Sequence, residues 1–284
     1  MISKIEETKA YFDDIEEGMY GKKNVADALA LIYHENSKFN RFSQRRQGEK
    51  IGIFYNPYIT ERSSQPFKHY PGAEKTELAK YNELPSPKVD LFETILNRRS
   101  LRDFNPDYQI SEREIQILLK HSYAVTQRVP MNDVKGHIGF RPVPSPGGLY
   151  ALELYLVLFN SQLGSGIFHF RPDEMSLEKI QDGNMLEVFK EIVTAEPYIN
   201  INNASGMIIT SGLYERLAIK YGERAYRFMI HESGFVAQNM SLVLEAIGLG
   251  SCMVGGYLDD KVNEVLGIDG VFETTHNILI FGKK

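Results

Sequence analysis

The pattern of apolar and polar residues divides the chain into a proline-rich first part and a second part with regular elements. In the first part, apolar residues recur at helical spacing over residues 25–33, and five prolines interrupt residues 56–87. Proline removes a backbone donor and disfavours helical geometry at the residue before it, so residues 56–87 are predicted to be extended. We therefore expect residues 1–88 to form a helical extension with a Pro/Tyr-rich arm, and residues 89–284 to form one domain.

In the second part, helical periodicity alternates with short apolar runs, which predicts an α+β fold with helices around a small mixed sheet. Helices are expected at residues 91–96, 112–121, 149–154, 177–180, 185–193, 213–220, 224–249 and 259–266, the second of them starting at a Ser111–Glu114 capping box. Strands are expected at residues 155–159, 167–171, 206–211, 251–257 and 275–281, with a polar loop between residues 129 and 140. The helix at 224–249 is the longest and is apolar nearly all round, so we expect it to be central, inside the fold or between subunits.

Composition and charge exclude several classes of protein. With 43% hydrophobic and 24% charged residues, the 284-residue chain has the composition of a soluble globular protein. Its net charge of -5 gives no reason to expect a nucleic-acid partner, and no apolar run approaches the roughly 18 residues of a membrane span. The charged first residues lack the apolar region of a secretory signal, and the lone cysteine, Cys252, excludes an intramolecular disulfide. We expect a cytoplasmic protein without nucleic-acid or membrane partners.

Four residues of the type that binds phosphate lie close together directly after the first helix of the predicted domain. They are Arg98, Arg99, Ser100 and Arg102. Guanidinium groups and a hydroxyl can bind a phosphate through several hydrogen bonds at once. The alternative is a solvated basic helix end, where the helix dipole also favours cations.

Two glycine pairs and two terminal lysines accompany this cluster. The loop residues are Pro144, Ser145, Pro146, Gly147 and Gly148, the second pair is Gly255 and Gly256 after an apolar run, and the lysines are Lys283 and Lys284. Each glycine pair alone is typical of an ordinary turn, but glycines also let a flat group approach the main chain. Together with the basic cluster, these residues suit a mononucleotide cofactor with a planar ring. The scattered histidines and Cys252 predict neither a metal site nor a cysteine nucleophile.

Several segments carry a resemblance to nitroreductase-type flavoproteins. They are RRSLRDF, PSPGGLYALELYLV, FHFRPDEMSLEKI, KYGERAYRFMIHESGFVAQNMSLVLEAIGLGSCMVGGYLDD and ILIFGKK. More narrowly, they resemble the SagB-type branch, the azoline dehydrogenases of ribosomal-peptide biosynthesis, and the HENSKF and FKHYP segments are similar to that branch too. The resemblance covers residues 88–284 and implies a nitroreductase-like fold that binds FMN at the interface of a homodimer.

The resemblance also implies roles for individual residues. The FMN phosphate and ribityl chain would be held by Arg98, Arg99, Ser100 and Arg102, with added charge from Lys283 or Lys284. The flavin ring would be lined by the loop Pro144, Ser145, Pro146, Gly147 and Gly148, and its N5 and O4 atoms would face the amides of Gly255 and Gly256. Gln238 and Asn239 would lie near the flavin. Lys220 and Tyr221 match the Lys-Tyr pair of the branch and would be its acid/base residues. An ordinary helix end is the alternative, because Glu223, Arg224 and Arg227 crowd the same turn and could form ion pairs.

The implied function is FMN-dependent oxidation of an azoline (a thiazoline or oxazoline) to the azole, in a peptide or a carrier-bound substrate. FMN would take a hydride, Lys220 or Tyr221 would take the proton, and dioxygen would reoxidise the flavin. The implied partners are a second copy of the chain, the substrate and a cyclodehydratase complex. Two alternatives remain: an NAD(P)H-dependent reductase of nitro or quinone compounds on the same fold, and a catalytically idle scaffold subunit of a peptide-modifying complex.

Overall fold

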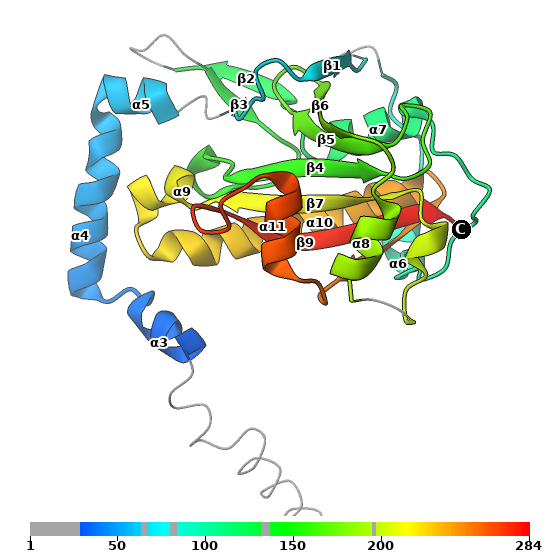
Figure 1. Cartoon of the computed structure of the whole chain (residues 1–284). Helices are drawn as coiled ribbons and strands as arrows, with labels where there is room; N and C mark the ends of the chain where they lie inside the picture. Colours follow the sequence, from blue (N-terminus) through cyan, green and yellow to red (C-terminus); the bar gives the residue numbers. More distant parts are fainter. Residues whose placement is uncertain (1–28, 64–66, 80–83, 132–136, 195–196) are drawn as a thin grey trace, which may run out of the picture. The chain divides into compact units, whose positions relative to one another are not determined.

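The computed structural model describes residues 29–63, 67–79, 84–131, 137–194 and 197–284 (Figure 1). Contacts divide the chain into two units, residues 1–49 and residues 50–284. In the first unit, helix α3 (Leu29–Asn36) has no buried residue. Helix α4 (Arg41–Gly52) contains the point of division and is preceded by Asn40, whose side chain accepts a hydrogen bond from the Ser43 amide at 2.8 Å. Among these described residues, no helix combines the length and apolarity needed to cross a lipid bilayer.

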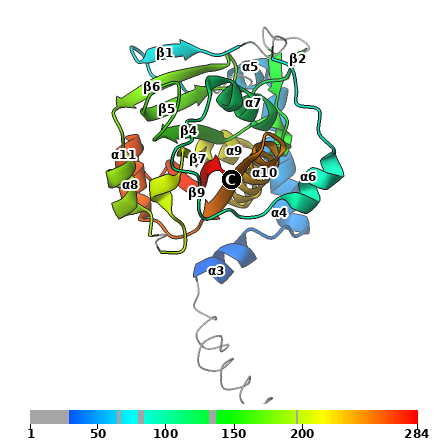
Figure 2. The ribbon, with the colours of Figure 1, turned by 90° about the vertical axis from the view of Figure 1, so that its right-hand side faces the viewer.

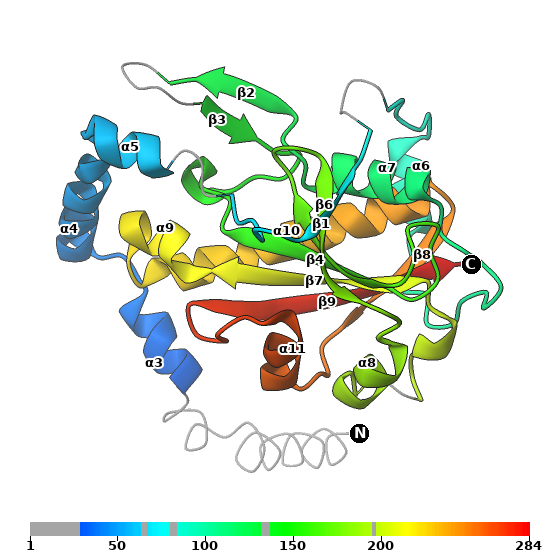
Figure 3. The same cartoon turned by 45° about the horizontal axis from the view of Figure 1, so that its top comes forward.

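The second unit is built on a seven-stranded sheet with the strand order β1-β6-β5-β4-β7-β9-β8 (Figure 3). The strands are β1 (Glu74–Glu77), β4 (Leu152–Leu158), β5 (Gly166–Arg171), β6 (Ser176–Asp182), β7 (Gly206–Leu213), β8 (Leu249–Val254) and β9 (Glu273–Lys283). All neighbouring strands in this sheet are antiparallel. A separate antiparallel pair consists of β2 (Gln127–Pro130) and β3 (His137–Phe140).

Helices cover both faces of the sheet, and each face has its own apolar core (Figure 2). One face carries α7 (Glu112–Ser122) and α10 (Arg224–Ala246), and the other carries α8 (Leu186–Ile192) and α11 (Asp259–Leu266). Along β4, Leu154 and Leu156 join the α7/α10 core, whereas Tyr155 and Val157 join the α8/α11 core. This alternation has the period of two that a strand requires, so β4 is a central strand buried on both faces.

A bulge interrupts the pairing of β7 with β9. The register skips His276, which is therefore an extra residue in β9. An extra residue exchanges the faces to which the following side chains point. On one side of the bulge, the Thr275 hydroxyl hydrogen-bonds Asn263 of α11 at 2.9 Å; on the other side, the Asn277 amide hydrogen-bonds the Ser233 carbonyl of α10 at 3.3 Å. The bulge thus gives β9 polar contacts to both helical layers.

The predicted α+β fold class is confirmed, and so are the elements that local signals define. Helix α7 starts at the predicted capping box, with the Glu114 amide donating to the Ser111 hydroxyl at 3.2 Å and the Ser111 amide donating to the Glu114 carboxylate at 2.9 Å. The helices predicted at 91–96, 213–220, 224–249 and 259–266 are α6 (Leu91–Asn97), α9 (Tyr214–Tyr221), α10 and α11. The helix predicted at 25–33 lies partly outside the described residues.

Other local predictions are wrong. Half of the helix predicted at 149–154 lies in strand β4, the helix predicted at 177–180 is strand β6, and the loop predicted at 129–140 contains residues of β2 and β3. In each case pairing with neighbouring strands overrides the local preference. The sheet is antiparallel and not mixed, because its neighbouring strands all run in opposite directions. Residues 56–87, predicted to be an extended arm, contribute helix α5 (Pro57–Ser63) and edge strand β1. The domain boundary near residue 88 stays a prediction.

Candidate active site

A tight loop containing two of the predicted glycines precedes β4. Ser145 leads into a 3-10 turn in which Gly147 and Gly148 both have a φ of +67°. Tyr150 follows with a φ of +48°, a conformation that is uncommon for residues with a side chain. The Tyr150 amide donates a hydrogen bond to the Ser145 hydroxyl at 2.9 Å. This bond closes the segment, which we call the 145–148 loop.

The 145–148 loop lies against the end of α9, where the two predicted acid/base residues are found. A Cβ atom added at Gly147 would lie 2.6 Å from the Tyr221 hydroxyl oxygen and 2.9 Å from the Lys220 Nζ atom. Only a glycine permits so close an approach of the main chain. The Lys220 Nζ atom also lies 5.0 Å from the centre of the Phe54 ring, and the Tyr221 ring meets Phe228 edge-on at 5.0 Å. The structure therefore brings together the predicted loop and the predicted Lys-Tyr pair.

Burial shifts the pKa values of Lys220 and Tyr221 in opposite directions. Removal from water disfavours the ammonium group and lowers the pKa of Lys220. The same burial disfavours the phenolate and raises the pKa of Tyr221. A lysine with a lowered pKa is a better proton acceptor near neutral pH, and a tyrosine with a raised pKa stays a hydrogen-bond donor. Lys220 is thus suited to accept a proton beside a hydrogen-bond donor, Tyr221.

A buried carboxyl group on α10, that of Glu232, binds the 145–148 loop. Its residue is 0% exposed, and its two oxygens accept hydrogen bonds from the Ser145 hydroxyl at 2.6 Å and from the Tyr123 hydroxyl at 3.0 Å. Burial raises the pKa of Glu232, although the Ser145 hydrogen bond and the Arg141 charge oppose the shift. Sequence reasoning missed this residue. The available signal is its spacing, because it shares the inward stripe of Met229 on α10.

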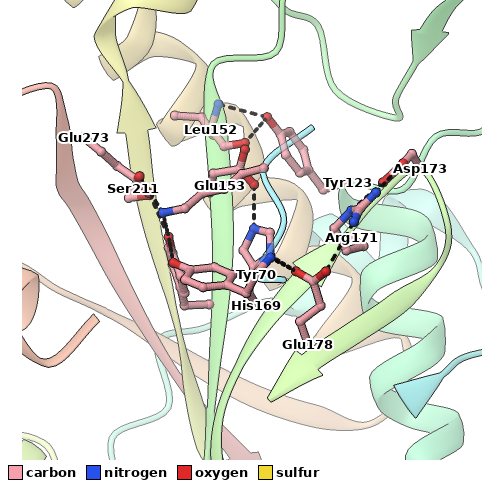
Figure 4. A network of polar contacts seen from close by, with 12 residues as sticks. Tyr70, Tyr123, Leu152, Glu153, His169, Arg171, Asp173, Glu178, Ser211 and Glu273 are labelled. Carbon is pink, nitrogen blue, oxygen red and sulfur yellow. Dashed lines mark hydrogen bonds and ion pairs between the residues drawn. The ribbon is translucent and has the colours of Figure 1, made fainter. Parts of the chain in front are cut away.

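A network of charged residues ties α9 to the sheet, and Figure 4 shows its part within the sheet, around His169. Arg216 of α9 forms an ion pair with Glu153 of β4 at 2.5 Å, and Glu153 also meets His169 Nε2 at 2.8 Å. The other ring nitrogen of His169 lies 3.0 Å from Glu178. Burial disfavours ionisation of Glu153, but the Arg216 charge and His169 outweigh it and hold its pKa at about 2. Because Arg216 and Lys220 are four residues apart on one helix, this anchor fixes the face that carries Lys220. Sequence reasoning missed Glu153 and Arg216, although a glutamate within an apolar strand signals a buried partner.

Residues of the predicted arm are tied to the other face of the sheet. The Lys68 Nζ atom lies 2.7 Å from the Glu273 carboxylate and 2.7 Å from the Tyr155 hydroxyl. The Tyr70 hydroxyl lies 3.0 Å from the same Tyr155 hydroxyl. Burial first, and then the Glu273 charge, raise the pKa of Tyr155, so that its hydroxyl stays protonated and donates to Glu273 at 2.8 Å. This part of the arm supports the sheet.

The predicted phosphate-binding residues lie at the end of α6, beside the edge strand β8. Ser100 forms a parallel bridge with Ser251 of β8. Ser100 and Arg102 are exposed and Arg98 is half-buried. The Arg99 guanidinium turns back, and its NH1 atom donates to two main-chain carbonyls at the end of the helix, at 2.7 and 2.8 Å. All but the half-buried Arg98 are therefore exposed, but the Arg99 guanidinium is engaged in capping α6.

The two terminal lysines both contact residues of this chain. Lys284 forms an ion pair with Glu245 of α10 at 2.5 Å. The Lys283 Nζ atom lies 5.2 Å from the centre of the Tyr108 ring. Within the chain, these contacts direct the two ammonium groups to α10 and to Tyr108.

The predicted Gln-Asn pair lies on α10, and its two members have different surroundings. Gln238 is exposed. The Asn239 amide donates to the His121 carbonyl at 2.8 Å, near the end of α7. In the single chain Asn239 thus satisfies a free carbonyl at a helix terminus, which is a structural role.

The predicted Gly255 and Gly256 lie on the other side of the sheet from the 145–148 loop. Both are exposed and follow β8, and the Gly256 carbonyl accepts a hydrogen bond from the Thr194 amide, just beyond α8, at 3.0 Å. Tyr221, against which the 145–148 loop packs, belongs instead to the α7/α10 core. One chain therefore does not bring the two predicted glycine pairs together.

Comparison with known proteins identifies a family and relatives that match parts of this chain. Residues 95–283 match the model of the nitroreductase family. The chain is 30% identical over 183 residues to MJ1384 of Methanocaldococcus jannaschii, provisionally named a nitroreductase, covering 64% of this chain and 86% of that protein. It is 28% identical over 134 residues to the microcin B17-processing protein McbC of Escherichia coli, covering 45% of this chain and 49% of McbC.

Solved structures share the fold. A structure from Anabaena variabilis, also provisionally named a nitroreductase, matches with a TM-score of 0.61 at 23% identity, over 76% of this chain and 43% of that chain. A chain of the E. coli microcin synthetase McbBCD complex with truncated pro-MccB17 bound matches with a TM-score of 0.55 at 19% identity, over 91% of this chain and 99% of that chain. This chain thus spans less than half of the Anabaena protein. At these identities, the likeness shows the fold alone.

Proposed function

Because the chain belongs to the nitroreductase family, we propose that it is an FMN-dependent oxidoreductase that oxidises an azoline to an azole in a peptide or carrier-bound substrate. The observation that supports the proposal is the close packing of the 145–148 loop, expected to face the flavin, on Lys220, whose pKa is lowered by burial, and on Tyr221, whose pKa is raised by it. Similarity to McbC, a microcin-processing protein, supports a peptide substrate and the SagB-type branch.

The residues at the end of α6 fit the phosphate of a mononucleotide. Ser100 and Arg102 are exposed and Arg98 is half-buried. All three lie on one short stretch of backbone, which Ser100 joins to β8 through a bridge. Their charge and hydroxyl donors would hold the FMN phosphate, and Gly255 offers open main chain beyond the same strand, because no atom lies within 4 Å of a Cβ added there. Bound FMN would supply the two-electron acceptor that azoline oxidation needs.

A second copy of the chain would complete the cofactor site. The residues that fit the phosphate follow α6, which packs near the end of α10, whereas the 145–148 loop is bound by Glu232 in the first half of that helix. Each site would therefore take one group from each copy. Helix α6 supplies an apolar surface for such a contact, with Leu91, Phe92 and Leu96 exposed by 60%, 74% and 69%. Apolar side chains grouped in this way are typical of a protein interface. A homodimer is therefore part of the proposal.

The proposed roles of the acid/base pair rest on the close approach of both side chains to Gly147 and on the directions of their pKa shifts. Oxidation of an azoline removes two hydrogens from adjacent ring atoms, one as a proton and the other with an electron pair. The Lys220 amine accepts the proton, because its lowered pKa makes the neutral form more available. The Tyr221 hydroxyl, which stays protonated, orients the ring by donating a hydrogen bond. In the overall balance, dioxygen receives both hydrogens and leaves as hydrogen peroxide.

The test uses the purified chain, a peptide that contains a thiazoline, and mass spectrometry to detect the loss of two hydrogens with release of peroxide. We expect the Lys220→Ala variant to remain yellow and to lose at least about 100-fold in turnover, the usual contribution of a general base. The Lys261→Ala variant is the control, because that exposed lysine only pairs with Glu264 at 2.8 Å. Turnover by Lys220→Ala equal to that of Lys261→Ala would reject the catalytic role.

A second candidate function is the NAD(P)H-dependent reduction of nitro or quinone compounds, which the 30% identity to MJ1384 favours. Rapid bleaching of bound FMN by NADPH, with turnover of a nitroaromatic and no azoline oxidation, would establish it in place of the first. A colourless protein that takes up no FMN would instead indicate a scaffold subunit of a peptide-modifying complex.

The proposed chemistry also implies partners and a location. An azoline forms when a cysteine, serine or threonine side chain closes onto the preceding carbonyl with loss of water, so a cyclodehydratase must supply the substrate. We include such a complex in the proposal, together with a cytoplasmic location, where the lone Cys252 would remain a thiol. Co-purification of the chain with a cyclodehydratase encoded beside it would test this association.

A further inference from the structure

We propose that Glu232 is a positioning residue for Lys220 and Tyr221: its hydrogen bond to Ser145 fixes the 145–148 loop over both side chains. The inference rests on the proposed function, because it concerns the same acid/base pair. Glu232 is 0% exposed, so it acts through other residues and not on the substrate.

The contacts of Glu232 join α10 to both ends of the segment that leads into β4. One carboxyl oxygen accepts the Ser145 hydroxyl at 2.6 Å, at the start of the loop. The other accepts the Tyr123 hydroxyl at 3.0 Å, and that hydroxyl in turn accepts the Leu152 amide at 3.2 Å, at the start of β4. The segment between Ser145 and Leu152 is therefore fixed at both ends by one side chain and its hydrogen-bonded neighbour.

Because this segment is fixed at both ends, the loop within it is held against α9. The Ser145 hydroxyl, held by Glu232, accepts the Tyr150 amide at 2.9 Å and so closes the loop around Gly147. A Cβ atom at Gly147 would lie 2.6 Å from the Tyr221 hydroxyl oxygen and 2.9 Å from the Lys220 Nζ atom. Any withdrawal of the loop would let water reach Lys220, and hydration would favour its charged form.

The surroundings of Glu232 make its hydrogen bonds hard to replace. The Arg141 guanidinium lies 4.2 Å from the centre of the Tyr123 ring and 4.7 Å from that of the Tyr150 ring, beside the carboxyl group that its charge favours. A buried hydroxyl that loses its partner retains its full cost of removal from water. An apolar side chain at position 232 would leave the Ser145 hydroxyl in that condition.

Glutamine is the conservative replacement. Its carbonyl oxygen can accept the Ser145 hydroxyl, and its amide can donate to the Tyr123 hydroxyl, whose own proton can go to the Leu152 carbonyl 3.2 Å away. Glu232→Gln thus keeps the anchor, Glu232→Leu removes it from α10, and Ser145→Ala removes it from the loop. Ser233→Ala is the matched control, because the Ser233 hydroxyl bonds within α10 to Ile230 at 2.8 Å and does not reach the loop.

The experiment measures how fast an amine-selective reagent labels Lys220 in the full-length chain as the pH is raised, with mass spectrometry to identify the labelled peptide. In Glu232→Leu and in Ser145→Ala we expect the pH midpoint for Lys220 to rise by about half a unit or more, a threefold loss of neutral amine. The Glu232→Gln and Ser233→Ala midpoints should stay at the wild-type value. The double variant should shift no further than either single variant, because both break the same link.

The outcomes distinguish a failure of the positioning role of Glu232 from a failure of the proposed azoline oxidation. The positioning role would be overturned if Ser145→Ala kept the wild-type midpoint for Lys220, or if the two shifts simply added in the double variant. If Glu232→Leu does not fold, Ser145→Ala alone still tests the role. If the variants show the expected shifts but the wild-type chain binds no FMN and oxidises no azoline, the proposed function is refuted and the positioning role of Glu232 stands.

Discussion

Replacing Gly147 and Gly148 by alanine, one at a time, separates backbone strain from contact with the acid/base pair. Both glycines have the same φ of +67°, so each alanine carries the same left-handed backbone cost of about 1–2 kcal/mol. Their neighbours differ. An alanine Cβ at position 148 meets no atom closer than 3.8 Å, whereas at position 147 it would lie 2.6 Å from the Tyr221 hydroxyl oxygen.

The size of the effect follows from the contact distance. Ordinary van der Waals contact begins at 3.4 Å, so the Tyr221 hydroxyl must move from 2.6 Å by the difference, about 0.8 Å. A displacement near 1 Å of a catalytic group costs about 100-fold in rate, which corresponds to about 2.7 kcal/mol in the barrier. The far ends of both side chains can swing aside, so we expect this cost to fall on turnover and not on folding.

The assay pairs urea unfolding with turnover of a thiazoline peptide. Both variants should lose a similar 1–2 kcal/mol or so of stability. Gly147→Ala should lose about 100-fold in kcat, and the loss in Gly148→Ala should be at least tenfold smaller. Equal losses of turnover, or a far greater loss of stability in Gly147→Ala, would refute the view that this glycine exists to let the main chain approach Tyr221.

Three further predictions concern other parts of the structure. Arg98→Ala should weaken FMN binding by about 1.5–3 kcal/mol in equilibrium dialysis, whereas Arg99→Ala should weaken it less, because its NH1 atom already caps α6. Arg216→Leu should cost about 3–5 kcal/mol in urea unfolding, since it leaves Glu153 buried without its cation. Burial lowers the pKa of His276 from 6.5 to about 4, so stability should fall as the pH drops through this range, by roughly 3 kcal/mol. Urea midpoints of a His276→Gln variant should show a flatter profile there.

Elements with local signals could be predicted from the sequence. The capping box of Ser111 and Glu114 needs only residues three apart, and it sets the start of α7 within one residue. The α9, α10 and α11 helices have apolar spacing that their own residues define. By contrast, residues 152–158 and 176–182 are strands because of neighbours that are distant in sequence, such as β7 beside β4. No local pattern could choose between helix and strand there.

In the candidate site, too, only features with a local signal in the sequence could be predicted. Lys220 and Tyr221 could be selected by resemblance, but their packing on Gly147 depends on the fold. The hydrogen bond from Ser145 to Glu232 joins residues 87 positions apart, and the two single residues carry no sign of each other. The assignment of FMN contacts to Arg98, Ser100 and Arg102 stays a prediction.

The bulge in β9 makes the length of this strand a stricter requirement than the identity of its extra residue. Deleting His276 would restore a regular ladder and reverse the direction of every side chain before it. Glu273 would then point away from Lys68 and Ser211, which it now meets at 2.7 Å each. Position 276 should therefore accept several substitutions, whereas the loss of one residue between 273 and 277 should break the contacts of Glu273 with Lys68 and Ser211. In this strand, sequence drift is tolerated and a change of residue count is not.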